Sequence, residues 1–303
     1  MRDDAPVGSL VVAARRRLAL IFNPTAGRRR RRRFAAALEL LSAGAAVRVM
    51  PTGARGDAER FAAAVAADGS ADAIVAAGGD GTINEVVNGM AGSGLPLGIV
   101  PLGTANVLAW ELGIGDRAAS AAGAILGGRT RAIHLGRCNG RYFTMMAGVG
   151  LDAQIVAAIR PPLKRAFGKL AYVHEGLVQI AKLKPTRYRV VVDGVAADAA
   201  TVIVCNGRYY AGRYVIAQAA DLGRPELHAC LFGRGGRLPA MRYSLAMLLD
   251  RLSTSPDLVI QPGTRIAIDG PAGAPVQGDG DVIGHLPAAI ELASTTLDMF
   301  VRR

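Results

Sequence analysis

Three short apolar runs in the first third of the chain each end in a glycine-containing loop and lead into a stretch with helical periodicity. These runs lie at residues 18–22, 73–77 and 97–100, and a further strand is expected at 47–50. Helices are expected between them at 28–41, 57–67, 82–90 and 106–112. Strand, loop and helix repeated in this order predict an α/β domain, a parallel sheet with helices on both faces. Ligands of such sheets bind beyond the carboxyl ends of the strands, where these loops gather.

The sequence pattern changes after about residue 128. Short β-branched runs at 142–146, 189–192, 201–204 and 265–268 are separated by glycine, proline or Asp-Gly, which predicts an antiparallel β-sandwich. Helical inserts are expected at 169–183 and 238–252. A chain of 303 residues favours two domains over one. We therefore expect a basic tail at 1–17, an α/β domain at 18–130, a β-sandwich domain at 131–290, and a segment at 291–303 that could return to the first domain.

The composition argues against several classes of protein. No apolar run reaches the about 18 residues that would cross a bilayer as a helix. The three cysteines, Cys138, Cys205 and Cys230, are far apart and form no CxxC pair, which argues against a disulfide framework and a zinc site. Asp3 and Asp4 stand where a secretory signal would carry basic residues. A reducing, cytoplasmic environment is therefore expected.

Positive charge is concentrated near the start of the chain. Residues 1–33 contain ten arginines against two aspartates, which is eight of the twelve net positive charges. A polyanionic partner is expected. The six arginines at 28–33 either form a solvated helix start or contact a triphosphate and anionic lipid headgroups. Nucleic acid is disfavoured as the partner, because aromatic residues make up 5% of the chain and none lies among these arginines.

The three loops have the chemistry of a phosphate site. Glycine lets the backbone approach a ligand closely, and a helix N-terminus presents free N–H groups to an anion. No lysine precedes Lys164, which excludes P-loop and protein-kinase sites, because both require a lysine close to the phosphates. Asp80 either acts through Mg²⁺ or its water shell, or caps the helix that starts at Thr82. Glu85 has the spacing of a capping-box partner of Thr82.

Six motifs together resemble the diacylglycerol kinase catalytic family, and within it the bacterial soluble lipid kinases. They occur in the family's order from about Leu18 to near the C-terminus: NPxxG at 23–27, GGDGTINEVVNG at 78–89, PLGTANVLAWELGI at 101–114, GVGLDAQIV at 148–156, CNGRYYAG at 205–212 and Gly-Asp-Gly-Asp at 278–281. The GGDGT string is shared with NAD kinases. The extended PLGTxNxxAxxLGI motif and the late Asp-Gly-acid motif favour a lipid substrate.

The resemblance implies an α/β nucleotide-binding domain followed by a β-sandwich, with ATP and Mg²⁺ between them. It also implies which residues contact ATP. Asp80 would bind the Mg²⁺ of MgATP through a water molecule, and Glu85, Gly103 and Asn106 would support the site. The implied ATP contacts are Asn23, Pro24, Thr25, Ala26, Gly27, Thr52, Gly78, Gly79, Asp80, Gly81, Thr82, Ile83, Asn84 and Thr104.

The resemblance further implies a carboxylate that activates the lipid hydroxyl, at Asp279 or Asp281. In a strand the two would share one face, with Gly280 opposite. The alternative is an Asp-Gly hairpin turn with two solvated carboxylates. Asp281 stands where the family usually has glutamate, one methylene longer. Arg224 falls roughly where the family has a metal-binding aspartate, so we expect its guanidinium to replace a structural Mg²⁺.

The sequence therefore predicts an ATP- and Mg²⁺-dependent lipid kinase, with diacylglycerol as the first substrate considered. Open alternatives are a sphingoid base, ceramide or another lipid alcohol, an NAD kinase, and a nucleotide-binding regulatory protein without catalysis. A peripheral position at the inner face of an anionic membrane is expected, and the oligomeric state stays open, a homodimer included. The segment 161–183 is either an amphipathic cover over the lipid entrance or a helix packed on the sandwich.

Overall fold

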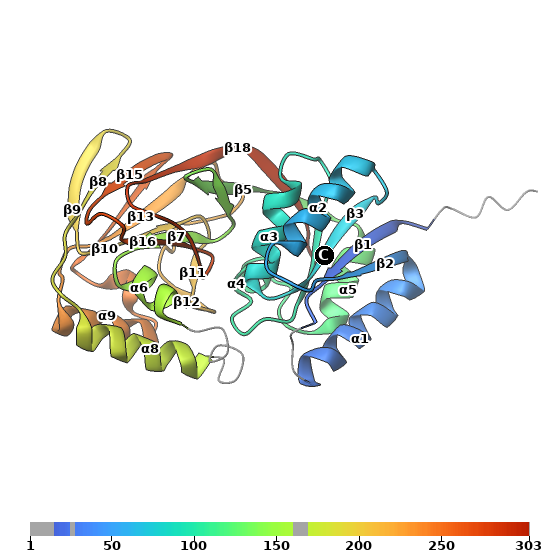
Figure 1. Cartoon of the computed structure of the whole chain (residues 1–303), viewed down its shortest axis with the longest axis horizontal. Coiled ribbons are helices and arrows are strands. Elements are labelled where there is room, and N and C mark those ends of the chain that lie inside the picture. Colours follow the sequence, from blue (N-terminus) through green and yellow to red (C-terminus); the bar gives the residue numbers. More distant parts are fainter. Residues whose placement is uncertain (1–14, 25–27, 160–168, 303) are drawn as a thin grey trace, which may run out of the picture.

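The computed structural model of this chain describes residues 15–24, 28–159 and 169–302, which form two lobes side by side (Figure 1). Within these residues, no helix is both long enough and apolar enough to cross a membrane.

The first lobe is a parallel α/β domain. Its sheet has the order β2-β1-β3-β4, and every neighbouring pair in it is parallel. Helices α1 and α5 pack together on one face, and α2 and α3 pack together on the other. The elements in chain order are β1 (Arg17–Phe22), α1 (Arg28–Gly44), β2 (Ala46–Pro51), α2 (Asp57–Asp68), β3 (Ala73–Gly78), α3 (Asp80–Met90), β4 (Leu97–Pro101), α4 (Val107–Glu111) and α5 (Ala118–Gly127). Strands β3 and β4 are buried throughout, because helices cover both faces.

The second lobe is an antiparallel β-sandwich with helices at one side. One of its sheets has the order β14-β13-β10-β7-β16-β17, and the strands β18-β15-β8-β9 form the other. Its elements are β5 (Thr130–Cys138), β6 (Arg141–Phe143), β7 (Met146–Val149), α6 (Leu151–Ala158), α8 (Lys169–Lys182), β8 (Tyr188–Val192), β9 (Val195–Ala199), β10 (Thr201–Cys205), β11 (Tyr209–Tyr210), β12 (Tyr214–Val215), β13 (Leu227–Phe232), α9 (Arg237–Leu248), η1 (Leu252–Thr254), β14 (Leu258–Gly263), β15 (Arg265–Asp269), β16 (Pro275–Gly278), β17 (Asp281–His285) and β18 (Ala288–Phe300). The predicted fold class is confirmed in both lobes.

A single long strand joins the two lobes. Strand β18 is 13 residues long and pairs with β15 and β5 in the second lobe. Near its end Met299 pairs in parallel with Leu97 of β4. In Figure 1 this strand runs along the top of the molecule from one lobe to the other. The sheet of the first lobe therefore continues into the sandwich, and backbone hydrogen bonds hold the lobes in place.

Two expected elements in the second half differ from the structure. The run 142–146 is not one strand, because the chain bends at Thr144 and Met145 between β6 and β7. The helix expected at 238–252 ends at Leu248, and Asp250 has a positive φ of 53° before the short helix η1 begins. The three cysteines are buried and free, in agreement with the sequence analysis.

Close packing of α2 against α3 generates a stability prediction. A Cβ at Gly89 would lie 2.2 Å from the backbone oxygen of Glu59, so Gly89→Ala forces these helices apart. We expect a loss of about 1–3 kcal/mol in the free energy of unfolding, measured by urea denaturation. Gly123→Ala in α5 is the matched control, because a Cβ there meets nothing within 4 Å. It should stabilise the protein by up to about 1 kcal/mol. Equal effects of the two variants would contradict the packing argument.

Candidate active site

The glycine loops that follow β1, β3 and β4 meet at one edge of the parallel sheet. The Asn23 amide donates a hydrogen bond to the Thr82 hydroxyl over 3.1 Å, which links the first loop to the second. The second and third loops touch through their backbones, since a Cβ on Gly103 would lie 2.6 Å from the Cα of Gly79. Only glycine fits at such a contact. Thr25, Ala26 and Gly27 lie outside the described residues.

The N-terminus of α3 has the features of an anion site. Gly79 is its N-cap residue and provides no side-chain hydrogen bond to the helix. Thr82, Asn84 and Ile83 are buried in its first turns. Thr52 is buried in the chain that follows β2, where its N–H donates to the carbonyl of Phe22 over 2.8 Å. The first N–H groups of a helix lack partners within the helix and favour negative charge. This end of α3 could therefore receive a phosphate group.

Part of the arginine run faces these loops. Arg30 donates to the Thr104 hydroxyl over 2.9 Å, and Arg33 donates to the carbonyl of Pro101 over 3.2 Å. Arg31 and Arg32 are exposed on the same helix. Two arginines of the run therefore contact the third loop and two are solvated, and contact of the run with a triphosphate or with lipid headgroups stays a prediction. Arg30 brings a guanidinium to the loop system, in a domain whose sequence has no lysine.

Asp80 ties the second loop to the helix after the third. Its two carboxylate oxygens accept hydrogen bonds from the backbone N–H of Asn106 over 3.0 Å and of Val107 over 2.8 Å. It therefore holds the start of α4 rather than only capping its own helix, which was the alternative, and its action through Mg²⁺ stays a prediction. Loss of hydration and, to a lesser extent, the negative charge of Asp279 raise the pKa of Asp80 to about 6, against the lowering effect of these hydrogen bonds.

Glu85 has a different structural role from the expected one. Its carboxylate accepts from the backbone N–H of Gly56 over 3.0 Å and of Ala58 over 3.2 Å. These groups belong to the start of α2, so Glu85 stabilises a neighbouring helix and the capping box with Thr82 is wrong. A carboxylate at a helix N-terminus is favoured by the helix dipole.

Asp279 lies in a hairpin turn and is saturated with hydrogen bonds. Asp279 and Gly280 both have positive φ, 51° and 87°, between β16 and β17. The expectation that Asp279 and Asp281 share a strand face is therefore wrong, and the Asp-Gly hairpin is present. The hairpin alternative also expected a solvated carboxylate at Asp279. The Asp279 carboxylate is instead enclosed, because it accepts five hydrogen bonds. The donors, at 2.7–3.1 Å, are the Asn84 amide, the Thr144 hydroxyl and the backbone N–H groups of Thr144, Met145 and Met146.

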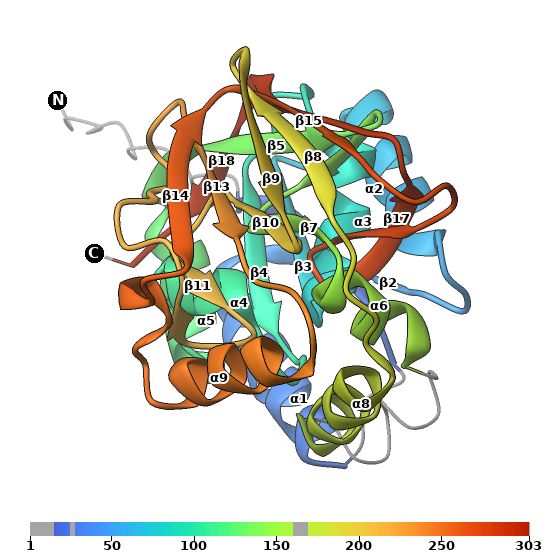
Figure 2. The same ribbon diagram turned by 90° about the vertical axis from the view of Figure 1, so that its left-hand side faces the viewer.

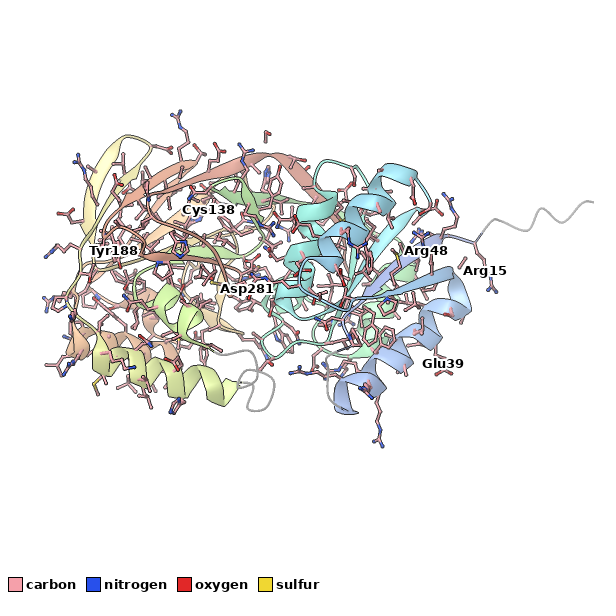
Figure 3. The ribbon with its side chains drawn as sticks, viewed as in Figure 1. Arg15, Glu39, Arg48, Cys138, Tyr188 and Asp281 are labelled. Carbon is pink, nitrogen blue, oxygen red and sulfur yellow. The ribbon has the colours of Figure 1, made fainter. Side chains whose placement is uncertain are left out.

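Asp281 is placed differently, at the start of β17. A Cβ on Gly81 would lie 2.6 Å from the Asp281 Oδ2, so the carboxylate lies against the backbone at the N-terminus of α3. Among the described residues, no hydrogen bond or ion pair engages this carboxylate. Figure 3 shows Asp281 between the two lobes. Of the two aspartates, Asp281 has the carboxylate free to interact with a ligand.

Two asparagines one helical turn apart, Asn84 and Asn88, bind the lobes together, and only Asn84 is among the ATP contacts expected from the sequence. Asn84 and Asn88 donate to the carbonyl of Tyr142 over 3.0 and 3.1 Å, and the Tyr142 N–H donates to Asn88 over 3.0 Å. Their spacing of four residues puts them on one face of α3. That spacing is visible in the sequence, whereas their partner Tyr142 is not.

A second buried polar cluster, around Asp152, contacts the turn between β16 and β17. Asp152 at the start of α6 accepts from the Gln277 amide over 2.7 Å and from the Tyr210 hydroxyl. Burial raises the pKa of Asp152. Gln277 in turn accepts from the backbone N–H of Gly280 over 3.0 Å, so this cluster supports the hairpin that carries Asp279. The GVGLDAQIV motif thus contributes a structural acid next to the site.

In the segment around Arg224, the arginine that pairs with Asp221 is Arg131 and not Arg224, which was expected to replace a structural Mg²⁺. Asp221 accepts from the backbone N–H of Gly223 over 2.8 Å and pairs with Arg131 of β5. Arg224 lies 3.9 Å from the carboxylate of Glu226. The guanidinium beside Asp221 therefore comes from another strand, which the local sequence does not show.

Comparison with known proteins gives matches over both lobes. Residues 17–138 match the family model of the diacylglycerol kinase catalytic domain. Residues 145–301 match the model described as the YegS C-terminal NAD kinase beta sandwich-like domain.

Relatives and solved structures are similar over much of the chain. A probable YegS-like lipid kinase of Klebsiella pneumoniae is 31% identical over 256 residues, which is 83% of this chain and 84% of the relative. The diacylglycerol kinase of Bacillus subtilis is 38% identical over 184 residues. This match covers 59% of this chain and 60% of the relative, which is less than two thirds of the relative's length. The crystal structure of a putative diacylglycerol kinase from Bacillus anthracis superposes with a TM-score of 0.81 at 23% identity, covering 97% of this chain and 98% of that one. This last likeness shows a shared fold.

The pKa of Asp80 predicts how stability depends on pH. Because the folded chain holds this proton more tightly than the unfolded chain, the free energy of unfolding should fall as the pH rises from about 4 through 6. The loss attributable to Asp80 is on the order of 2–3 kcal/mol. Urea denaturation from pH 4 to 7.5 measures it as the difference between the wild type and Asp80→Asn. A difference that is the same at every pH would refute the raised pKa.

Proposed function

This chain belongs to the diacylglycerol kinase family of lipid kinases, and from that premise we propose that it transfers the γ-phosphate of ATP to a hydroxyl of a membrane lipid, diacylglycerol first. It is a kinase with an alcohol group as acceptor. The observation that carries the specific proposal is the carboxylate of Asp281, which no other described residue engages and which the second lobe presents to the N-terminus of α3 in the first. An acceptor hydroxyl and a phosphate would meet at that point.

The first lobe supplies groups suited to a triphosphate. The α3 N-terminus, the hydroxyls of Thr82 and Thr104 and the guanidinium of Arg30 lie around the three loops. These are the donors that a phosphate needs where no lysine is present. They support ATP as the phosphate donor.

The residues present also fit a magnesium ion that arrives with the nucleotide. Among the described residues, no group of three or more His, Cys, Asp or Glu side chains is arranged to hold a metal. Each oxygen of Asp80 accepts one backbone hydrogen bond and keeps a second lone pair for a metal-bound water. Bound Mg²⁺ would neutralise the phosphate charges that develop during transfer.

Asp281 would act as the general base for the lipid hydroxyl. Its carboxylate would accept the hydroxyl proton while the hydroxyl oxygen bonds to the γ-phosphorus and the bridging oxygen departs with ADP. Asp279 cannot take this role in the described arrangement, since five hydrogen bonds already fix its two oxygens. We assign Asp279 to positioning, because it holds the turn from which Asp281 extends.

Paired substitutions separate these two roles. Asp281→Asn should lower kcat by a factor of about 10²–10⁴. The KM for ATP should stay within about twofold of the wild-type value, and the free energy of unfolding within about 0.5 kcal/mol. Asp279→Asn places an amide N–H against N–H donors, so it should cost about 2–4 kcal/mol in the free energy of unfolding. Steady-state kinetics and urea denaturation of both variants measure these effects. A fully active Asp281→Asn variant would overturn the assignment of the base.

A substrate panel tests the proposed reaction itself. Purified protein with Mg²⁺ and γ-labelled ATP is offered diacylglycerol, sphingosine, ceramide and NAD in separate mixed-micelle assays. We expect label in phosphatidic acid at a rate at least tenfold above the other three acceptors. Label mainly in a sphingoid phosphate would retain the chemistry and change the substrate class. Label mainly in NAD would reject a lipid substrate.

A further inference from the structure

Helix α9 carries a stripe of large apolar side chains on its outer surface. Leu238, Met241, Leu245 and Leu248 are 75%, 55%, 58% and 60% exposed, and Leu249 just after the helix is 59% exposed. Their spacing of three or four residues aligns them along one face. In both views the helix lies at the lower margin of the second lobe, beside α8 (Figures 1 and 2).

This outer stripe is additional to the face that attaches α9 to the protein. On the inner side Ala240 is buried, and the ring of Tyr243 packs edge-on against Phe232 at 4.9 Å between centroids. A helix that is apolar on both sides is normally enclosed by protein or lipid. The inner contacts account for the attachment of α9, and they leave the outer leucines without a structural reason.

Basic side chains border the stripe. At about 100° per residue, Arg237 and Arg242 fall on opposite margins of the apolar face, and both are exposed. The helix contains no acidic residue. An apolar stripe with arginines along its edges matches the boundary between acyl chains and anionic headgroups, where leucine enters the hydrocarbon and arginine stays with phosphate.

We propose that α9 is a membrane-docking helix that inserts its leucine stripe into an anionic bilayer. This inference rests on the proposed function in that a membrane-embedded substrate requires the enzyme to work at the lipid surface. The start of α1, with its exposed Arg31 and Arg32, also lies at the lower side of the molecule in both views. Docking through α9 would therefore bring additional positive charge towards the same surface.

Charge favours a bilayer over a second copy of the chain as the occupant of this face. A symmetric dimer through α9 would bring the basic margins of two copies towards each other, and the exposed Arg237, Arg242 and Arg251 outnumber Asp250, the acidic residue that follows the helix. The chain as a whole carries a net charge of +12, which opposes association of two copies and favours an anionic lipid surface.

Vesicle flotation without ATP or substrate tests docking independently of catalysis. The probe is vesicles of phosphatidylglycerol and phosphatidylcholine, with pure phosphatidylcholine for comparison. We expect the double variant Leu245→Gln/Leu248→Gln to bind the anionic vesicles at least tenfold more weakly than the wild type. Val195→Gln is the matched control, since Val195 is 58% exposed on the distant strand β9, and it should bind as the wild type does.

A second measurement reports insertion directly. An environment-sensitive dye on Leu245→Cys should brighten on adding anionic vesicles, and the same dye on Val195→Cys should not. The proposal would be overturned if the double variant bound vesicles as tightly as the wild type. It would also be overturned if the wild type were a dimer, and the double variant were a monomer that still bound vesicles normally. Failure of the substrate panel together with normal flotation would reject the proposed reaction and leave the docking helix in place.

Discussion

The carboxylate of Asp279 is the interaction on which the site depends. It receives donors from α3 of the first lobe and from the bend between β6 and β7 of the second, while lying itself in the turn between β16 and β17. Three segments far apart in the chain therefore meet at two oxygen atoms. Hydrogen bonds to a carboxylate are roughly twice as strong as those between neutral groups. The same contact explains why residues 142–146 bend, because three successive N–H groups turn towards one acceptor.

This contact works together with the continuous sheet. Strand β18 pairs with β4 and β5 and aligns the lobes over a long distance, whereas Asn84, Asn88 and Asp279 fix them locally beside the glycine loops. A phosphoryl transfer enzyme mainly positions and neutralises its substrates. Lobes joined by a shared strand and by these local contacts provide such positioning. They keep Asp281 against Gly81, and no described residue bonds to the Asp281 carboxylate.

The distribution of charge has a structural counterpart. The first domain contains no lysine. Arg30 and Arg33 of α1, the helix after the first glycine loop, contact the third glycine loop instead. The start of α1 and the helix α9, which carry further exposed arginines, both lie at the lower side of the molecule in Figures 1 and 2. Positive charge that the sequence shows as one block is thus divided between a phosphate site and an outer surface.

The sequence alone determined the fold class, the order of strands and helices in the first lobe, and the loops that gather at its sheet edge. These features follow from local periodicity and glycine positions, which act within a few residues. Only the tertiary structure decided the partners of the charged side chains. Asp80 holds α4, Glu85 holds α2, Asp221 pairs with Arg131, and Asp279 is enclosed, whereas Asp281 has no partner among the described residues. The physical reason is that Asp80, Glu85 and Asp279 find their donors, and Asp221 its arginine, on segments distant in the sequence, and local spacing carries no information about such contacts.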